Sequence, residues 1–269
     1  MRHFKRLGAT AVVLLLAVGC SSVEGQERAT SDNASSTPVT RPVKVVALGD
    51  SDATGIGDST GRGWVRRYGD LVHAKLDVPV AVDNQAYEGQ TSEQLLTAIT
   101  GVGSLRRTLS RADVILIGIG GADLNIGDEA WAEGLCSGRS CYKLLLARFG
   151  KNIAAIAHEV RQLAPTAALR AISLPNGVPG AGDAIPASAA PISLYQVQTE
   201  RKLVCAAMQS SGGQCVDVVR AFNGDNGDGD AYAKGLMTTD PCCYPSANGQ
   251  QLIAQLLVAT GLEGLVGAG

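Results

Sequence analysis

Histidine is scarce in this chain, which has three histidines among 269 residues. His3 lies in the first apolar segment, whereas His73 and His158 lie in stretches whose periodicity predicts helices. The last third of the chain has no histidine. Imidazole is the side chain most often used for proton transfer near neutral pH. Chemistry at the carboxyl-terminal end of this chain would therefore lack the commonest general base.

Long apolar runs are also missing. Residues 1–19 begin with Arg2, Lys5 and Arg6 and continue into an apolar run over 7–18, which is too short to span a bilayer as a helix. This segment predicts a signal for export. The residues before Cys20 read Leu-Ala-Val-Gly and resemble a bacterial lipobox, which implies cleavage before Cys20, its lipidation, and attachment to the outer face of the cell membrane. The alternative is ordinary secretion, with Cys20 removed or free.

Basic residues are not in excess. Residues 20–42 are rich in Ser, Thr, Asp, Glu and Asn and contain no aromatic residue, so we expect a disordered tether behind the lipidated Cys20. Without residues 1–19 the chain keeps 20 of its 23 basic residues and all 25 acidic ones, a net charge of −5. This charge argues against a nucleic-acid-binding protein, which would show a basic footprint.

Cysteine spacing of the CxxC type, which would indicate a zinc site, is absent as well. Beyond Cys20 there are six cysteines, and an even number in an exported chain favours disulfide bonds. Proximity favours Cys136 with Cys141 and Cys205 with Cys215. Cys242 and Cys243 would then form a vicinal bond, stay reduced, or pair elsewhere.

The remaining residues, 43–269, are roughly 220 in number and fit one domain with a sizeable core. Apolar runs rich in β-branched residues alternate with helical patterns, which predicts a parallel sheet covered on both faces. The predicted strands span 43–48, 78–84, 113–119, 169–174 and 214–219. The predicted helices span about 63–76, 152–163, 192–208 and 246–257. Two long connections are expected at 124–142 and 175–191, and such loops are often functional.

Three sequence blocks directly follow predicted strands, and a fourth precedes the last predicted helix. The first is Gly49-Asp50-Ser51 with Gly55 behind it. The second and third run from Asn84 through Gly89 and from Gly118 through Gly121, Ala122 and Asp123. The fourth continues from Asp240 through Tyr244, Pro245 and Ser246 to Gly249. In this order the four blocks resemble the SGNH or GDSL-type hydrolase family of esterases and lipases, over essentially the whole domain.

The resemblance implies a flavodoxin-like three-layer α/β/α sandwich with a five-stranded parallel sheet. It also implies that Ser51 is the nucleophile and that the Gly89 amide helps to hold an oxyanion, since glycine lets the backbone approach a substrate closely. Further binding positions on the same blocks are Asp50, Asn84, Gly121, Ala122 and Asp123. The family needs no cofactor or metal.

Two departures from the family pattern concern catalysis. Ala122 stands where the family has an asparagine that donates to the oxyanion, and the loss of one such donor typically costs about a hundredfold to a thousandfold in turnover. Tyr244 stands at the position of the catalytic histidine, and an unperturbed tyrosine, with a pKa of about 10, is a poor base near neutrality. Pro241 replaces the aspartate, and Asp240 is displaced from it by one position.

Three functional hypotheses follow. The leading one is an exported lipoprotein whose serine hydrolyses an acyl ester or acylated glycan weakly, with Asp240 or Tyr244 assisting proton transfer. The second is a non-catalytic module that binds a ligand at the cell surface. The third keeps the fold but uses a different residue set near Ser51, such as Asp52 or Asp123. The acidic segment 223–230 does not fit the ligand register of a calcium loop, and we expect a solvated turn there.

Overall fold

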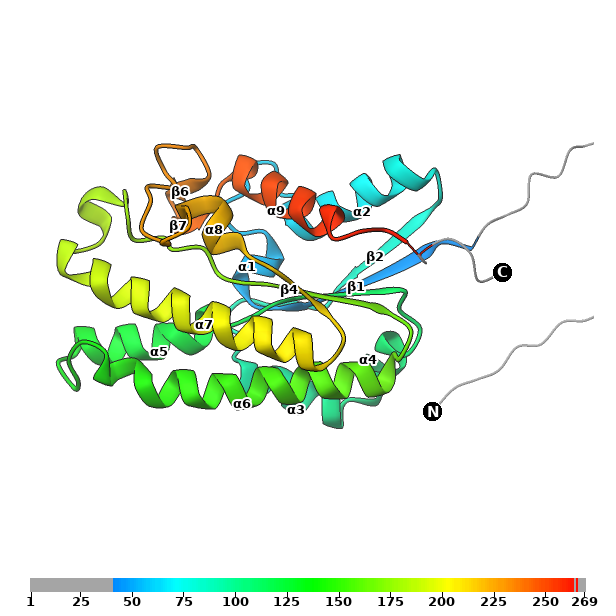
Figure 1. The fold of residues 1–269 in the computed structure, drawn as a ribbon, viewed down its shortest axis with the longest axis horizontal. Helices are drawn as coiled ribbons and strands as arrows, with labels where there is room; N and C mark the ends of the chain where they lie inside the picture. The colour runs from blue at the N-terminus through cyan, green and yellow to red at the C-terminus, as the bar shows by residue number, and fades with distance from the viewer. Residues whose placement is uncertain (1–40, 264, 266–269) are drawn as a thin grey trace, which may run out of the picture. The chain divides into compact units, whose positions relative to one another are not determined.

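The computed structural model describes residues 41–263 and 265, and Figure 1 shows how their helices and strands are arranged. The expectations for the signal segment, for lipidation of Cys20 and for the tether up to residue 40 lie outside the described residues. The described residues form one compact unit. None of the described helices is long and apolar enough to cross a membrane.

The five-stranded parallel sheet expected from the sequence is confirmed. Its strands follow the order β2-β1-β3-β4-β5, and every neighbouring pair is parallel. The strands are β1 (Val43–Gly49), β2 (Val80–Asn84), β3 (Val114–Gly118), β4 (Ala168–Ile172) and β5 (Gln214–Val216). Since parallel strands end at a common edge, the loops after β1, β2 and β3 meet there.

Helices cover both faces of this sheet, because alternate residues of each central strand point to opposite sides. Val45 and Ala47 of β1 join the core under α2 (Gly63–Leu76), α8 (Val218–Asn223) and α9 (Ala247–Ala259). Val46 and Leu48 join the core under α3 (Ser92–Gly101), α4 (Gly103–Leu109), α6 (Ser140–Leu163) and α7 (Ala190–Ser210). Figure 1 shows the two helical layers on opposite sides of the strands.

The predicted connection 124–142 is wrong, because most of it is helical. Helix α5 (Gly121–Ala132) fills its first part, and α6 begins at Ser140. A Cβ atom on Gly127 would lie 2.5 Å from the Tyr142 ring, so this glycine permits close packing of two helices. The glycine content that suggested a loop therefore reflects a helix–helix contact. The connection 175–191 does contain irregular chain, with 3-10 turns at Gly182–Ala184 and Ala187–Ala189.

The fifth strand is shorter than expected. It ends at Val216, and residues predicted to continue it belong to α8. The Asp217 side chain accepts a hydrogen bond from the Arg220 amide, so this residue caps the helix and ends the strand. The apolar pair Val218 and Val219, which suggested a strand, is buried on the helix instead.

A short chain segment stands apart from the main sheet. Strands β6 (Met237–Thr239) and β7 (Cys242–Pro245) form a separate two-stranded antiparallel sheet. The structure contains the disulfide bonds Cys136–Cys141 and Cys205–Cys215, which the spacing favoured, and joins Cys242 to Cys243 as a vicinal pair in β7. The fourth sequence block is thus a hairpin in front of α9.

Candidate active site

Ser51 lies at the carboxyl edge of the sheet. Strand β1 ends at Gly49, and Ser51 is the first residue of the short helix α1 (Ser51–Thr54). The first amides of a helix have no acceptor within that helix, so the Ser51 amide and hydroxyl stand at the end of the strand with their donors available. The position agrees with the role expected of a nucleophile on this fold.

The Asp50 side chain stabilises the turn between β1 and α1. Its carboxylate is buried and accepts hydrogen bonds from the amides of Gly120 (2.9 Å), Ala122 (3.3 Å) and Asp52 (3.2 Å). Burial raises the pKa of Asp50 to about 6, while the amide donors act in the opposite direction. Asp50, expected to bind a ligand, therefore ties α1 to the start of α5 and positions Ser51.

A pocket of about 340 Å³ opens beside Ser51. Its walls come from α1, α5, α7, the segment after β4, and β7. It combines polar groups with apolar ones, as small-molecule sites usually do. The lining residues are Ser51, Asp52, Gly121, Leu124, Asn125, Asp128, Leu174, Pro175, Asn176, Gly177, Val178, Ile185, Ser193, Gln196, Val197, Cys242, Cys243 and Tyr244.

Tyr244 and Asp240, the two residues expected to assist Ser51, are placed differently. Tyr244 lines the pocket together with Ser51, on the hairpin that also contributes the vicinal disulfide. Asp240 is exposed and does not line the pocket. Its backbone oxygen accepts a hydrogen bond from the Thr238 hydroxyl at 3.0 Å. Of the two, only Tyr244 shares the pocket with the serine.

Both described histidines lie outside the pocket. His73 is in α2, with Nδ1 2.7 Å from the Val78 carbonyl oxygen, and His158 is exposed on α6. Among the described residues, no side chain forms a hydrogen bond with the Ser51 hydroxyl. The arrangement therefore offers a serine without a paired imidazole.

Asp52 directly follows Ser51 in sequence, and it lines the same pocket. Burial, followed by the charge of Asp50, raises the pKa of Asp52 to about 8. The backbone carbonyl of Asp52 accepts a hydrogen bond from the Trp64 ring at 2.9 Å, which fixes this part of α1. A carboxyl that stays protonated near neutrality can exchange a proton with a ligand in the pocket.

Asp123, the other acid considered as a substitute, does not line the pocket. Its carboxylate accepts hydrogen bonds from the Ser92 amide at 2.8 Å and from the Ser92 hydroxyl at 2.6 Å. Ser92 begins α3, so Asp123 holds the start of that helix against α5. Its role in the structure is to support the fold.

The second block lies beside the Ser51 turn. The Tyr87 amide donates to the Gly49 carbonyl at 3.2 Å, and the Asn84 side chain donates to the Ala53 carbonyl at 2.8 Å. Gly89 has a φ of 75°, in the left-handed region that favours glycine, and open space around the position of a Cβ atom. It is exposed and does not line the pocket.

The third block contributes one pocket residue. Gly121 lines the pocket, whereas Ala122 is buried with its amide directed to Asp50. Asn125 lies one turn further along α5 and lines the pocket, although the sequence interpretation placed it in a loop. Its four-residue spacing from Gly121 would have indicated this position if the helix had been recognised.

Other polar residues of the pocket were missed by the sequence interpretation. Asp128 accepts hydrogen bonds from the Tyr142 hydroxyl at 2.5 Å and from the Gln196 side chain at 3.2 Å. Asn176 is buried and donates to the Gly227 carbonyl at 2.9 Å. They come from separate parts of the chain, and no local pattern brings them together. Within the described residues, no cluster of three or more His, Cys, Asp or Glu side chains could hold a metal ion.

The fold agrees with comparisons against known proteins. The model of the GDSL-like lipase/acylhydrolase family matches residues 47–252, and the chain therefore belongs to that family. The uncharacterized protein YpmR of Bacillus subtilis is 30% identical over 119 residues, which span 42% of this chain and 44% of that relative. The chain thus matches less than half the length of this relative.

Solved structures show the same fold. A lipase from a goat rumen metagenome is 19% identical, with a TM-score of 0.68 over 83% of this chain and 99% of that protein. Phospholipase A1 from Streptomyces albidoflavus is 18% identical, with a TM-score of 0.57 over 82% of this chain and 100% of that protein. An acetyl xylan esterase variant from Geobacillus stearothermophilus is 16% identical, with a TM-score of 0.56 over 80% and 93%. The family and the fold establish a GDSL-type hydrolase domain.

Proposed function

We propose that this protein is an exported lipoprotein whose domain hydrolyses an acyl ester slowly through Ser51. The observation that carries the proposal is the position of Ser51 at the end of β1, where it lines a pocket of about 340 Å³. In this proposal Ser51 attacks the carbonyl, and the Ser51 amide holds the developing oxyanion. The Gly89 amide, which lies outside the pocket, would join it only if the substrate extends to the second block. The pocket volume is near the lower end of the usual range for small ligands, about 300–1,000 Å³, which suits a short acyl group.

The proton of Ser51 needs an acceptor, and we assign this role to Asp52 in preference to Asp240. Asp52 lines the Ser51 pocket, whereas Asp240 is exposed outside it. Because the pKa of Asp52 is raised to about 8, only a minor fraction of its carboxyl groups is ionised at neutral pH. A base that is mostly protonated agrees with slow hydrolysis at neutrality. Tyr244 lines the same pocket, and we assign to it the contact with the leaving group.

The decisive experiment measures hydrolysis of a short-chain activated ester by the wild type and by Ser51→Ala. We expect slow wild-type turnover that falls to the uncatalysed rate in Ser51→Ala. Turnover that survives this substitution would exclude the serine mechanism. Fast wild-type turnover that is lost in Ser51→Ala would contradict the expectation of slow hydrolysis. That expectation rests on the missing histidine and asparagine.

A ligand-binding module is the alternative function, favoured by the lack of any side-chain hydrogen bond to the Ser51 hydroxyl among the described residues. In that case Ser51→Ala would bind the natural ligand with unchanged affinity, and no ester would be turned over. If the protein is an esterase, Ser51→Ala would still bind the ester, but only the wild type would form product. Product formation therefore separates the two functions.

The proposed substrate is a small acyl ester or an acylated glycan. Solved relatives of the fold include an acetyl xylan esterase and a phospholipase. The polar pocket residues Asn125, Asp128 and Gln196 offer hydrogen bonds to hydroxyl groups, which favours the glycan. Anchoring through Cys20 on the outer face of the membrane would place the domain among such polymers. Mass spectrometry of the processed amino terminus tests the anchor, since Cys20→Ser would abolish the acyl mass.

A further inference from the structure

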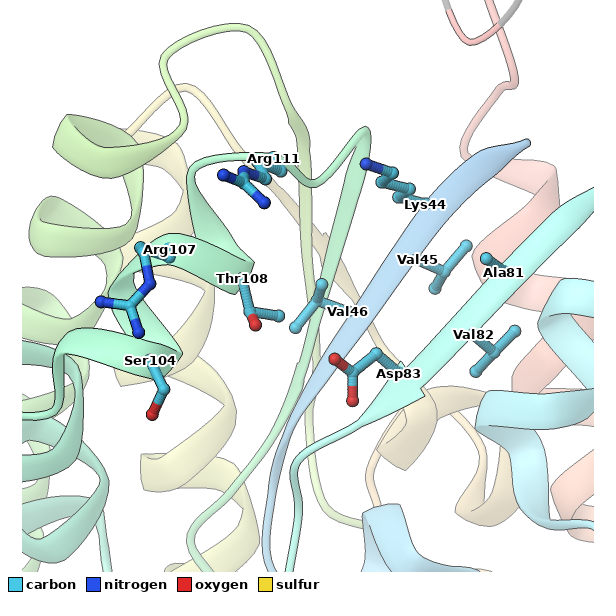
Figure 2. Close-up of a pocket in the computed structure, with 10 residues that line it drawn as sticks. All are labelled: Lys44, Val45, Val46, Ala81, Val82, Asp83, Ser104, Arg107, Thr108 and Arg111. Carbon is cyan, nitrogen blue, oxygen red and sulfur yellow. The ribbon is translucent and has the colours of Figure 1, made fainter. Parts of the chain in front are cut away.

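A second hollow lies on the sheet away from Ser51, between α4 and the strands β1 and β2 (Figure 2). It has a volume of about 440 Å³. Helices α3 and α4 pack over β1 and β3 and leave the face of the edge strand β2 uncovered, so that Ala81 and Asp83 are exposed. We call this hollow the α4 groove. Its lining residues are Lys44, Val45, Val46, Ala81, Val82, Asp83, Ser104, Arg107, Thr108 and Arg111.

One wall of the α4 groove is polar and basic because of helical spacing. Ser104, Arg107, Thr108 and Arg111 follow one another at intervals of three, one and three residues, which places them on one side of α4 and the turn after it. The opposite wall is formed by alternate residues of two paired strands. Lys44 pairs with Ala81 and Val46 with Asp83. Figure 2 shows Lys44 and Asp83 directed from the strands toward the side of α4.

The charge of the α4 groove differs from that of the chain as a whole. Lys44, Arg107 and Arg111 contribute three positive charges against the single carboxylate of Asp83, whereas the chain beyond residue 19 has a net charge of −5. Within the described part of the chain, none of these three cations forms a salt bridge, although neighbouring arginines do. Arg106 lies 3.9 Å from Glu159, and Arg41 lies 2.8 Å from Asp113. Three exposed cations around one hollow attract an anion.

We propose that the α4 groove binds the phosphate group of a phosphate ester, with Arg107 and Arg111 as its main ligands. The planar guanidinium group offers paired N–H donors that match a phosphate oxygen pair. Lys44 adds a positive charge from the opposite wall, and the Ser104 and Thr108 hydroxyls supply further donors. Ala81 is exposed in the groove and adds apolar surface, which suits the organic part of an ester better than free inorganic phosphate.

The test measures binding of two probes that share a glycerol phosphate group, one a soluble monoester and the other a lipid phosphodiester. Glycerol phosphate is titrated in a calorimeter, and phosphatidylglycerol vesicles are compared with phosphatidylcholine vesicles in co-sedimentation. All samples are the full chain carrying Cys20→Ser, so that an acyl anchor contributes to none of them. Any effect of residues 1–40 is common to all variants and cancels in the comparison.

We expect Arg107→Gln and Arg111→Gln each to weaken binding about fivefold to tenfold, because each removes a charge-assisted hydrogen-bonding group. Asp83→Asn should strengthen binding about twofold to fivefold, because it removes the one negative charge from the groove. Lys75→Gln changes an exposed cation on α2 and serves as the matched control, with unchanged binding expected. Thermal unfolding of each variant checks that the fold is kept.

Binding of both probes would show that a soluble phosphate ester is sufficient for binding to the α4 groove. Binding of the vesicles alone would identify the ligand as a lipid headgroup. Either result supports the proposal when the arginine variants weaken it. Failure of both probes to bind would overturn the proposal. Equal weakening by Lys75→Gln and Arg107→Gln would overturn it as well, since the attraction would then come from overall charge. None of these outcomes depends on ester hydrolysis.

Discussion

Asp50 and Asp52 are two residues apart, but they differ in their hydrogen-bond donors and therefore in their pKa values. Burial raises the pKa of Asp50 only to about 6, because three backbone amides donate hydrogen bonds to its carboxylate and oppose the effect of burial. No described residue donates a hydrogen bond to the Asp52 carboxyl, which also lies beside the charge of Asp50. Two neighbouring carboxyls cannot both ionise easily, so the first proton leaves Asp50 and the second stays on Asp52.

The pH dependence of hydrolysis follows from this order. If Asp52 accepts the Ser51 proton, kcat/KM rises as the pH rises through about 8, because only the ionised carboxylate is a base. Asp52→Asn should remove this rise and lower the rate. The measurement is kcat/KM from pH 5 to 9, with the rate of Ser51→Ala subtracted to remove hydroxide-driven hydrolysis.

Asp225→Asn is the matched control, since Asp225 is exposed and pairs with Arg220 away from the pocket. Its pH profile should be that of the wild type. A rise that is equally steep in Asp52→Asn would show that another group supplies the base.

Restoring the family residues should raise activity. The double change Ala122→Asn with Tyr244→His adds one oxyanion donor and one general base, each ordinarily worth about a hundredfold in rate. The gain should be smaller because Pro241 replaces the aspartate that would orient the new histidine, and because Ala122 is buried, which limits the room for an asparagine. The measurement is kcat on a short-chain activated ester.

The single changes and the addition of Ser51→Ala serve as controls for this experiment. The gain should disappear when Ser51→Ala is added to the double variant. A double variant no faster than the wild type would show that the hairpin does not bring residue 244 within reach of Ser51.

At the scale of elements, Asp123 connects two helices at the base of the site. Asp123→Ala removes both acceptors of Ser92 and leaves a buried amide unpaired, which should lower the free energy of unfolding by about 2 kcal/mol. Chemical denaturation measures this change. Glu129→Ala, on the exposed side of the same helix, should change the free energy by no more than about 0.5 kcal/mol. Equal effects of the two changes would contradict the structural role of Asp123.

The sequence predicted the elements with strong periodicity and missed those set by tertiary contacts. Four of the five strands and the helices at 63–76 and 246–257 lie within about two residues of their expected bounds, because apolar spacing determines them. Helix α5 was missed because Gly127 lies against Tyr142, a contact that is invisible in the local sequence. Strand β5 was overextended because a helix cap at Asp217 overrides two β-branched residues.

The site was predicted only where a residue directly follows a strand or lies in a fixed motif. Ser51 and Tyr244 line one pocket, although 193 residues separate them in the sequence. The placement of Asp240 outside that pocket depends on the path of the β6–β7 turn. The placement of Asn125 in the pocket depends on α5 being helical. Neither feature has a local sequence signal.

At the scale of the whole molecule, buried carboxyls make stability depend on pH. Burial raises the pKa of Asp52 to about 8 and that of Glu200 well above its ordinary value. The folded protein therefore keeps protons that the unfolded chain releases above about pH 4. The contribution of these two carboxyls to the free energy of unfolding is greatest below this pH and is lost as the pH rises through about 8. Hydrogen bonds from Thr60 and Arg67 lower the pKa of Asp58 to about 2 against the effect of burial. Asp58 therefore stabilises the folded protein above about pH 4, and this stabilisation is lost as the pH falls toward 2.

Glu200→Gln tests this dependence, because glutamine has the shape of the protonated acid and does not titrate. One Glu200 oxygen accepts from the Leu174 amide at 3.2 Å, and glutamine keeps this acceptor. Urea denaturation at pH 5 and pH 8 should show a smaller loss of stability in the variant than in the wild type. A wild type that is more stable at pH 8 than at pH 5 would contradict the direction of the shift.

The two-stranded sheet of β6 and β7 forms no part of the main sheet, although it carries the pocket wall with Tyr244. Ser51 and Tyr244, which line the same pocket, thus belong to substructures with separate hydrogen-bond ladders. Residues 239–244 can therefore be varied without changing any main-sheet pairing, whereas Met237 and Pro245 are buried in the domain and have to be kept. The hairpin turn is accordingly a place where new acid–base groups can be sampled by directed evolution beside the pocket.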